Sequence, residues 1–441
     1  MGAHPTNPPS YRSVAFGTMA GATIEWYDFY VFGVAAALAL NRIFFANVPP
    51  AVGTLLAFGT FAVAWFARPL GGIIFSHLGD RIGRKRVMVA TLLTMGSATT
   101  LIGLLPNYGT IGVTAPILLV IVRIVQGIAC GGEWGAATVT AVENAPAGRR
   151  GLFGAFPQMG VPAGLFLSSV VSLAFYALPD EQLLSWGWRV PFLLTAVFVV
   201  VGQFLRRKLP ESAEFTAEKE QGKIARFPLG EALRHHWRGI LVILFAEAIV
   251  NVGFYTTTTY ILDYTTSDGT FQRTTVLAIV AVAALVDIGI VLLAGILSDR
   301  FPPKKILLVG IVIGALQFIA IFPLADSGNA IALVVGIAVI WPIAHGLAHG
   351  SQPSYFAGLF PTRVRLTGMS VGYQICGTVF SGPLPIIAAA LIAVAGGSPW
   401  LFVGYTVLVG IVSIIATVAG NPRYTEAEPA PAADVATGAT V

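Results

Sequence analysis

Twelve long apolar runs constrain the fold of this 441-residue chain more than any other feature. A bilayer core about 30 Å thick requires about 20 apolar residues per helix, or somewhat more when the helix is tilted. Hydrophobic residues make up 56% of the chain and charged residues only 11%, so a water-soluble fold would lack the polar side chains to cover its surface. The sequence therefore predicts an all-α integral membrane protein. Its twelve transmembrane helices are expected near residues 13–40, 52–78, 87–105, 114–141, 151–178, 188–209, 238–264, 272–298, 306–323, 329–357, 365–393 and 398–420.

The basic residues are distributed unevenly between the two sides of this arrangement. Of the 26 lysines and arginines, 21 fall on the side that holds both termini, and only Arg42, Arg189 and Arg273 fall in the loops on the other side. Loops on the cytoplasmic side of membrane proteins carry such an excess of basic residues. The distribution predicts a multi-pass protein of the inner (plasma) membrane with both termini in the cytoplasm. It also explains the net charge of +5 without nucleic acid as a partner.

One hydrophilic insertion, residues 210–237, divides the runs into six and six. Motifs in the two halves also match at nearly constant offsets: Asp80-Arg81 recurs as Asp299-Arg300, and Pro146 with Arg150 recurs as Pro361 with Arg365. Two such repeats predict a duplicated transporter with two pseudo-symmetric bundles. The expected organisation is a cytoplasmic tail (1–12), a six-helix bundle (13–209), a cytoplasmic linker (210–237), a second six-helix bundle (238–420) and a disordered cytoplasmic tail (421–441).

Several short motifs resemble one known family of transporters. The loop after the second run closely fits the pattern of the major facilitator superfamily, and other motifs resemble its metabolite:proton symporters over nearly all of residues 13–420. The resemblance implies the twelve-helix fold of that superfamily. It also implies the import of carboxylates, shikimate-like acids or zwitterionic osmolytes together with protons. The motifs are Gly79 to Arg86, Glu25 to Phe29, Arg123 to Trp134, Trp186 to Arg189, Leu209 to Ser212 and Phe360 to Arg365.

Charged residues within the runs are the first candidates for proton coupling. An ionisable group at the centre of a membrane is costly, so each one requires a partner or a function. Asp28 in run 1 and Arg123 in run 4 lie at similar depths when counted at about 1.5 Å per residue. A carboxylate substrate competing for Arg123 would release Asp28 to bind a proton. The alternative is a static pair that only sets the helix register; Glu25 and Glu133 are further candidates with either role.

Polar residues at three- or four-residue spacing form stripes on otherwise apolar runs. Such stripes are expected to line a hydrated cavity, although hydrogen bonds that only join helices are the alternative. Two histidines four residues apart fit a titrating site better than a metal site. The predicted substrate-binding residues are Tyr27, Arg123, Gln126 and Gln158 in the first half and Asn251, Tyr255, His345, His349, Gln352 and Gln374 in the second. Asp287 in run 8 is expected to make an interhelical hydrogen bond.

The loop after run 2 combines an acid with several bases, and we expect it to form a cytoplasmic gate. Basic residues alone would serve only to orient the protein, but the acid adds nothing to orientation and recurs in the second half. The predicted gate residues are Gly79, Asp80, Arg81, Gly83, Arg84, Lys85, Asp299 and Arg300. Because Pro302 and Pro303 stand where the resembled family often has glycine and arginine, the second copy is expected to be less regular.

Together these features predict a monomeric secondary active transporter that imports a small organic acid with protons. Import of a zwitterion such as betaine or proline, and proton-driven export by the same fold, remain alternatives. No catalytic triad or phosphate-binding loop is present in the sequence, so we expect neither an enzyme nor an ATP-driven pump. No cofactor and no metal are expected. The expected partners are the small-molecule substrate, protons and the lipid bilayer.

Overall fold

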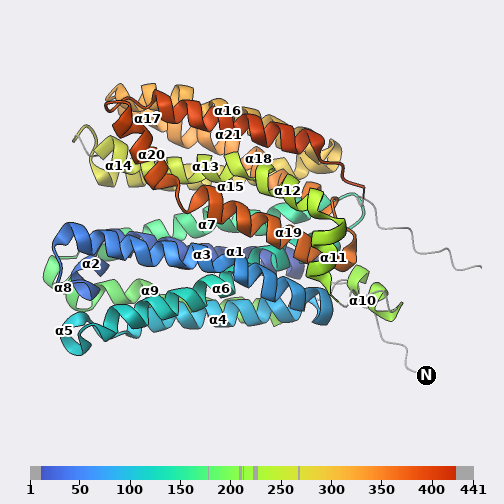
Figure 1. Ribbon diagram of the computed structural model, residues 1–441, viewed down its shortest axis with the longest axis horizontal. Coiled ribbons are helices and arrows are strands. Elements are labelled where there is room, and N and C mark those ends of the chain that lie inside the picture. The colour runs from blue at the N-terminus through green and yellow to red at the C-terminus, as the bar shows by residue number, and fades with distance from the viewer. Residues whose placement is uncertain are drawn as a thin grey trace, which may run out of the picture.

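The computed structural model describes residues 11–176, 178–207, 211, 213–221, 227–266 and 269–423, and no strand occurs within these ranges. The helices form two bundles that lie side by side (Figure 1). One bundle contains the first half of the chain, coloured blue to green, and the other contains the second half, coloured yellow to red. The predicted all-α class is confirmed. Most of the two predicted tails, residues 1–10 and 424–441, lies outside the described residues.

The first bundle contains six long helices joined by short loops or single helical turns. Proline opens α3 and α4 follows after a single glycine, so two helices succeed each other with almost no connection. The long helices are α1 (Tyr11–Leu38), α3 (Pro50–Ile82), α4 (Arg84–Leu104), α6 (Thr114–Glu143), α7 (Arg150–Tyr176) and α9 (Val190–Arg207). The short ones are α2 (Leu40–Phe44), α5 (Tyr108–Ile111), α8 (Asp180–Ser185) and η1 (Gly187–Arg189).

The second bundle also makes six passes, but three of them are composite. Within the described residues, wide π-helical turns occur only here, and they interrupt the passes that carry the predicted polar stripes. The continuous helices are α15 (Arg273–Arg300), α16 (Pro303–Asp326) and α21 (Trp400–Ala419). The composite passes are α12 (Trp237–Ala246), α13 (Ala248–Tyr255), η2 (Thr256–Tyr260) and α14 (Ile261–Thr266); α17 (Ala330–Val334), η3 (Val335–Ile340) and α18 (Trp341–Ala357); and α19 (Thr362–Cys376), η4 (Gly377–Ser381) and α20 (Leu384–Val394).

Ten of these passes are long and apolar enough to cross a bilayer, judged on the described residues. The α1 helix and the α19–α20 pass complete the predicted twelve. Between the bundles, α3 packs against α19 and α7 packs against α15. Between α9 and α12, the helices α10 (Ala213–Glu220) and α11 (Pro228–His235) lie at one end of the molecule (Figure 1). We call this the basic end, because the basic clusters at 81–86 and 300–305 lie there.

Candidate functional site

A small cavity lies between the two bundles. Four of the predicted substrate-binding residues line it: Asn251, Tyr255, His345 and His349. The first bundle contributes Trp26 and Val161 to its wall. These four residues of the seventh and tenth passes therefore face a cavity, and their role in binding a substrate stays a prediction.

The acidic group of this cavity is Glu247, at the junction of α12 and α13. Asn251 Nδ2 donates a hydrogen bond to Glu247 Oε1 at 3.2 Å, and the amide of Gln352 donates to Oε2. No lysine or arginine in the described structure forms an ion pair with Glu247. Gln352 is fully buried and does not line the cavity. Its hydrogen bond orients the carboxyl of Glu247, which does.

Two predicted glutamines join the bundles at the level of the cavity. Gln158 of α7 donates to the carbonyl of His349 at 3.0 Å and lies 3.2 Å from its Nδ1, while its Oε1 accepts a hydrogen bond from Trp134. Gln374 of α19 donates to the carbonyl of Gly131 at 2.9 Å. Both side chains therefore link the bundles in this conformation.

A buried ion pair lies in the first bundle, beside Trp26. Arg68 Nη2 of α3 lies 3.5 Å from Glu25 Oε1 of α1, and both side chains are 1% exposed. The guanidinium stacks over Trp65 at 4.3 Å and lies 4.8 Å from the centroid of Phe29. Its Nε and Nη2 atoms, and both oxygens of Glu25, have no hydrogen-bond partner within the described structure. The cation is therefore buried among aromatic rings with free donors.

Arg68 is a candidate site residue that is absent from the binding residues predicted from the sequence. Its position in a transmembrane run was visible, but no spacing rule links it to Glu25, which lies on another helix 43 residues earlier. Only the packing of α1 against α3 brings the two side chains together. The available signal was the rarity of arginine within apolar runs.

The predicted ion pair between Asp28 and Arg123 does not form. Asp28 accepts hydrogen bonds from Thr195 Oγ1 at 2.6 Å and from Thr99 Oγ1 at 2.8 Å. Thr99 in turn accepts one from Gln126 Nε2 at 2.7 Å, and the Oε1 of Gln126 contacts the guanidinium of Arg123. The acid and the base are thus connected by a relay of two side chains.

The prediction was wrong because equal depth in the membrane defines only how far along its helix a residue lies. It does not define the direction in which the side chain points around the helix axis. Arg123 stacks over Phe32 at 3.8 Å, and its remaining N–H groups point to the carbonyls of Thr60 and Phe61 at 3.4 Å. Tyr27 is also directed away from the cavity, since its hydroxyl donates to the carbonyl of Pro191 at 2.8 Å. Tyr27, Arg123 and Gln126 therefore do not line the central cavity, contrary to expectation.

Glu133 forms a buried ion pair within the first bundle. Its two oxygens contact both terminal nitrogens of Arg206, one at 2.9 Å, and Oε2 accepts a hydrogen bond from Thr91 at 2.6 Å. Arg206, near the end of α9, is fully buried. The carboxylate is thus fully paired in this conformation.

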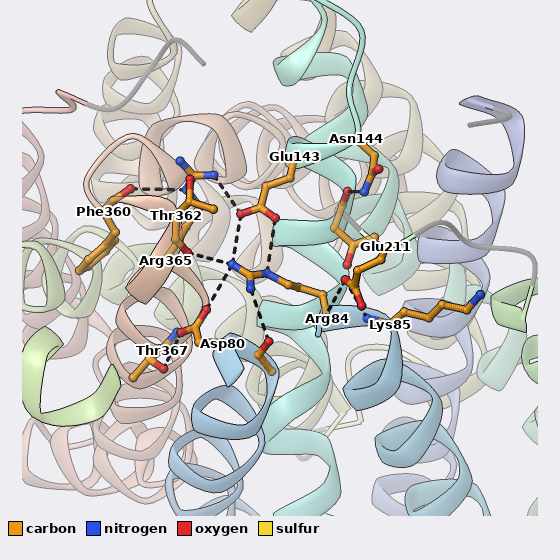
Figure 2. Close-up of polar contacts among 12 residues, drawn as sticks. Asp80, Arg84, Lys85, Glu143, Asn144, Glu211, Phe360, Thr362, Arg365 and Thr367 are labelled. Carbon is orange, nitrogen blue, oxygen red and sulfur yellow. Dashed lines mark hydrogen bonds and ion pairs between the residues drawn. The ribbon is translucent and has the colours of Figure 1, made fainter. Parts of the chain in front are cut away.

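At the basic end, the predicted gate is a buried network that joins the two bundles (Figure 2). Asp80 at the end of α3 accepts hydrogen bonds from the backbone N–H and the hydroxyl of Thr367 on α19, at 2.9 and 2.7 Å. Arg84 lies 3.3 Å from Asp80 and donates to the carbonyl of Thr362 at 2.8 Å. Glu143 at the end of α6 contacts Arg84 on one side and Arg365 on the other. This network links the two bundles at the basic end.

Two glycines of the motif are required by the local geometry. Gly83 has a φ of 112°, which side chains with a Cβ rarely adopt, and a Cβ there would collide with Glu211. Gly79 lies where α3 approaches Leu366 of α19 too closely for a side chain. Glu211 Oε1 accepts the backbone N–H of Arg84 at 2.9 Å and so caps α4.

The second copy of the motif is simpler. Asp299 at the end of α15 accepts the backbone N–H groups of Gly151 and Leu152 at 2.6 and 3.1 Å, at the start of α7. It thus caps a helix of the other bundle. Arg81 and Arg300, both predicted gate residues, are exposed and make no described contact across the bundles. The described residues contain no group of three possible metal ligands.

Comparison with known proteins identifies the family to which the chain is similar. A model described as "Major Facilitator Superfamily" matches residues 18–385. The chain is 40% identical over 403 residues to a "Shikimate transporter" of Escherichia coli (strain K12), which covers 90% of this chain and 92% of that relative. It is 32% identical over 407 residues to an "Ectoine/proline transporter ProP" of Corynebacterium glutamicum, covering 88% of this chain and 80% of that one.

Solved structures show the same fold. The proton:xylose symporter XylE bound to 6-bromo-6-deoxy-D-glucose superposes with a TM-score of 0.75 over 92% of this chain and 94% of that chain. The sequence identity is 17%, so this likeness concerns the fold alone.

Proposed function

Because the chain belongs to the major facilitator superfamily and is therefore a transporter rather than an enzyme, we propose that it imports a small organic acid together with protons by alternating access. The observation that carries this proposal is the buried pair of Glu25 and Arg68 beside the central cavity. Arg68 is a cation with unused donors, and a carboxylate is the ligand that matches the fork of a guanidinium. The relative named as a shikimate transporter supports this substrate class.

The pair also supplies a physical reason for proton coupling. A substrate carboxylate that binds Arg68 replaces Glu25 as its counter-charge. An uncompensated buried carboxylate costs several kcal/mol, so Glu25 then binds a proton. Substrate and proton enter together, and the site stays electrically balanced. The cavity borders Trp26 but not Arg68, which lies over the Trp26 ring. The aromatic side chains around Trp26 must therefore separate before a substrate in the cavity can contact Arg68.

This assignment replaces Arg123 by Arg68 as the substrate-binding base and places the coupling proton on Glu25. Asp28 remains a second candidate for proton coupling, through the relay of Thr99 and Gln126. Glu133 is the least suited of the predicted coupling residues because Arg206 already pairs both of its oxygens.

We further propose an inner-membrane location as a single chain, with the basic end and both termini in the cytoplasm. The excess of basic residues at that end supports this orientation. The conformation described above is then closed toward the cytoplasm by the network around Arg84. Reporter fusions after residue 441 and within the loop at 105–114 test it: activity of a cytoplasmic reporter at the second position would reverse the orientation.

Shikimate uptake into proteoliposomes under an imposed pH gradient tests the substrate-binding role of Arg68. A bidentate charge-assisted contact contributes about 3 kcal/mol, so Arg68→Ala should lower uptake about 100-fold. Arg42→Gln is the control, because Arg42 forms only an exposed ion pair with Asp180 far from the cavity. Accumulation by Arg68→Ala at the rate of the control would refute the assignment.

The coupling role needs a separate measurement. Glu25→Gln should exchange labelled substrate across the membrane without a gradient, yet lose accumulation driven by the pH gradient, because the amide cannot bind the coupling proton. Asp28→Asn is compared in the same assays. If Asp28→Asn loses accumulation and Glu25→Gln keeps it, coupling runs through Asp28 instead.

One observation favours a second candidate substrate class. Glu247 lines the cavity with only amide partners, so a zwitterion would find an anion there and a cation at Arg68. The relative named as an ectoine/proline transporter fits this alternative. Competition by proline or betaine with shikimate uptake distinguishes the two, and Glu247→Gln should weaken only the competition by zwitterions.

A further inference from the structure

The second bundle contains a buried acid–imidazole pair that the proposed function does not use. Asp287 of α15 is fully buried, and its Oδ2 lies 2.8 Å from Nδ1 of His345 on α18. Its other oxygen, Oδ1, has no hydrogen-bond partner within the described structure. The expected interhelical hydrogen bond of Asp287 is thus present, and its partner is a group that can itself bind a proton.

The surroundings of this pair provide no compensating cation. The titratable groups that face it are His349 on the same helix as His345, Tyr30 on α1 and Glu247 on the seventh pass. The neighbouring polar groups of α7 and α16, Gln158 and Gln317, are uncharged amides. No lysine or arginine of the described residues contacts either member of the pair.

Without a compensating cation, the pair of Asp287 and His345 is most stable when its net charge is zero. With one proton fewer than its neutral form, it would hold a net negative charge in an apolar interior, which costs several kcal/mol. Binding one proton makes the pair neutral, either as imidazolium with carboxylate or as imidazole with carboxylic acid. Aspartate and histidine act here as one unit, and the proton belongs to both.

His345 lies between this buried carboxyl and two small cavities. It borders both the central cavity and a second small cavity between α13, α16 and α18. Its ring stacks on His349 with centroids 4.8 Å apart, and His349 Nε2 has no hydrogen-bond partner in the described structure. When the central cavity opens and fills with water, the imidazole is wetted while Asp287 stays buried.

From this geometry we propose that Asp287 and His345 form a second proton-binding site, which exchanges its proton through the central cavity during transport. The inference rests on the proposed function in that the proton bound at Glu25 balances the substrate carboxylate. A proton carried on Asp287 and His345 then adds one positive charge per cycle. Import of a monoanion becomes electrogenic and responds to a membrane potential that is negative inside.

A proton count in the absence of substrate tests the site itself. Purified protein in unbuffered detergent is titrated between about pH 5 and about pH 10, so that proton release against the cost of the negative pair is counted as well. Wild-type protein should release one proton more than Asp287→Asn or His345→Gln. The second variant guards against misfolding of the first, and both must elute as wild type in size-exclusion chromatography. Equal counts for all three proteins would overturn the proposal.

Transport then tests its role. In proteoliposomes with shikimate as the probe, a potassium diffusion potential, negative inside, should accelerate uptake by wild type. The charge moved per shikimate should fall by one elementary charge in Asp287→Asn, whose carboxyl lies outside the central cavity, whereas uptake driven by the pH gradient remains. An unchanged charge ratio would contradict the second site, while wild-type uptake that ignores the pH gradient would instead contradict the proposed function.

Discussion

The two loops at the basic end occupy equivalent places in the two halves, yet they join the bundles differently. Asp80 and Asp299, 219 residues apart, each accept hydrogen bonds from a helix of the opposite bundle. Lys85 and Lys304, at the same separation, each donate to carbonyls at the end of a neighbouring helix: Lys85 to Arg207 at 2.8 Å, and Lys304 to Val418 and Gly420 at 2.7 and 2.9 Å.

The two loops differ at the residue that directly precedes the lysine. Arg84 occupies this position in the first copy, and Pro303, the first residue of α16, occupies it in the second. Glu143, the second acid that contacts Arg84, is also unmatched, because Gly358 stands 215 residues after Glu143. Both copies thus have an aspartate that contacts the opposite bundle and a lysine that contacts a helix end, whereas the described residues contain the buried charge network in the first copy alone. The α3–α19 contact should therefore be much more resistant to opening than the α7–α15 contact.

Of the changes proposed here, removing Arg84 should weaken the α3–α19 contact most. Arg84→Ala leaves Asp80 buried without its cation, and loss of one partner from a buried ion pair costs about 3–5 kcal/mol. The closed population should fall about 100-fold or more if the network exists only in that state. The measurement is maleimide labelling of Ser370→Cys, buried on α19, in a background lacking Cys130 and Cys376. Arg81→Ala, exposed three residues earlier, is the matched control, and equal labelling rates would contradict the network.

The two aspartates should differ when each loses its charge. Asp80→Asn removes the attraction to Arg84, and we expect about a tenfold increase in labelling at the basic end. Asp299→Asn keeps an acceptor for one backbone N–H and loses mainly its interaction with the dipole of α7. That interaction contributes about 0.3–1 kcal/mol, or about two- to fivefold. Equal effects of the two variants would show that the copies close the basic end equally.

The side-chain hydrogen bond of Thr367 adds a smaller contribution. Thr367→Val removes the hydroxyl that donates to Asp80 and keeps the backbone N–H that also donates. A net hydrogen bond contributes about 1 kcal/mol, so labelling should rise about fivefold. In an Asp80→Asn background the effect should shrink, because the acceptor has lost its charge. Full additivity of the two changes would place Thr367 outside the network.

The smallest effects should be equal in the two copies. Lys85→Met and Lys304→Met each remove a donor to the end of a helix, at partly exposed positions where such contacts contribute about 0.3–1 kcal/mol. Each variant should lower the midpoint of thermal unfolding by about 1–2 °C, measured on purified protein. A much larger loss for one lysine would show that this part of the repeat is not shared.

The sequence predicted this architecture well wherever one helix was enough to define a feature. Apolar runs marked the helices, and polar stripes marked the cavity residues Asn251, Tyr255, His345 and His349. Pro302 and Pro303 predicted a less regular second copy, and Pro303 stands where the first copy has Arg84. These are periodic or local signals, which a single helix carries by itself.

Contacts between helices were not predictable in the same way. Asp28 and Arg123 match in depth, but their orientation around the helix axes depends on how α1, α4 and α6 pack. The partners of Asp80 and Glu25, namely Thr367 and Arg68, come from other helices, and Thr367 lies 287 residues away. No spacing within the sequence encodes such a pair, so only the packed bundle reveals it.

The π-helical turns η2, η3 and η4 have a mechanical consequence. A π turn widens the helix and breaks its regular hydrogen bonding, so the helix bends there more readily than elsewhere. The first bundle has no such turn among its described residues and is cross-braced by Glu133 with Arg206. During a transport cycle we therefore expect the first bundle to move as a rigid body. The second bundle should flex along its three interrupted passes around the bound substrate.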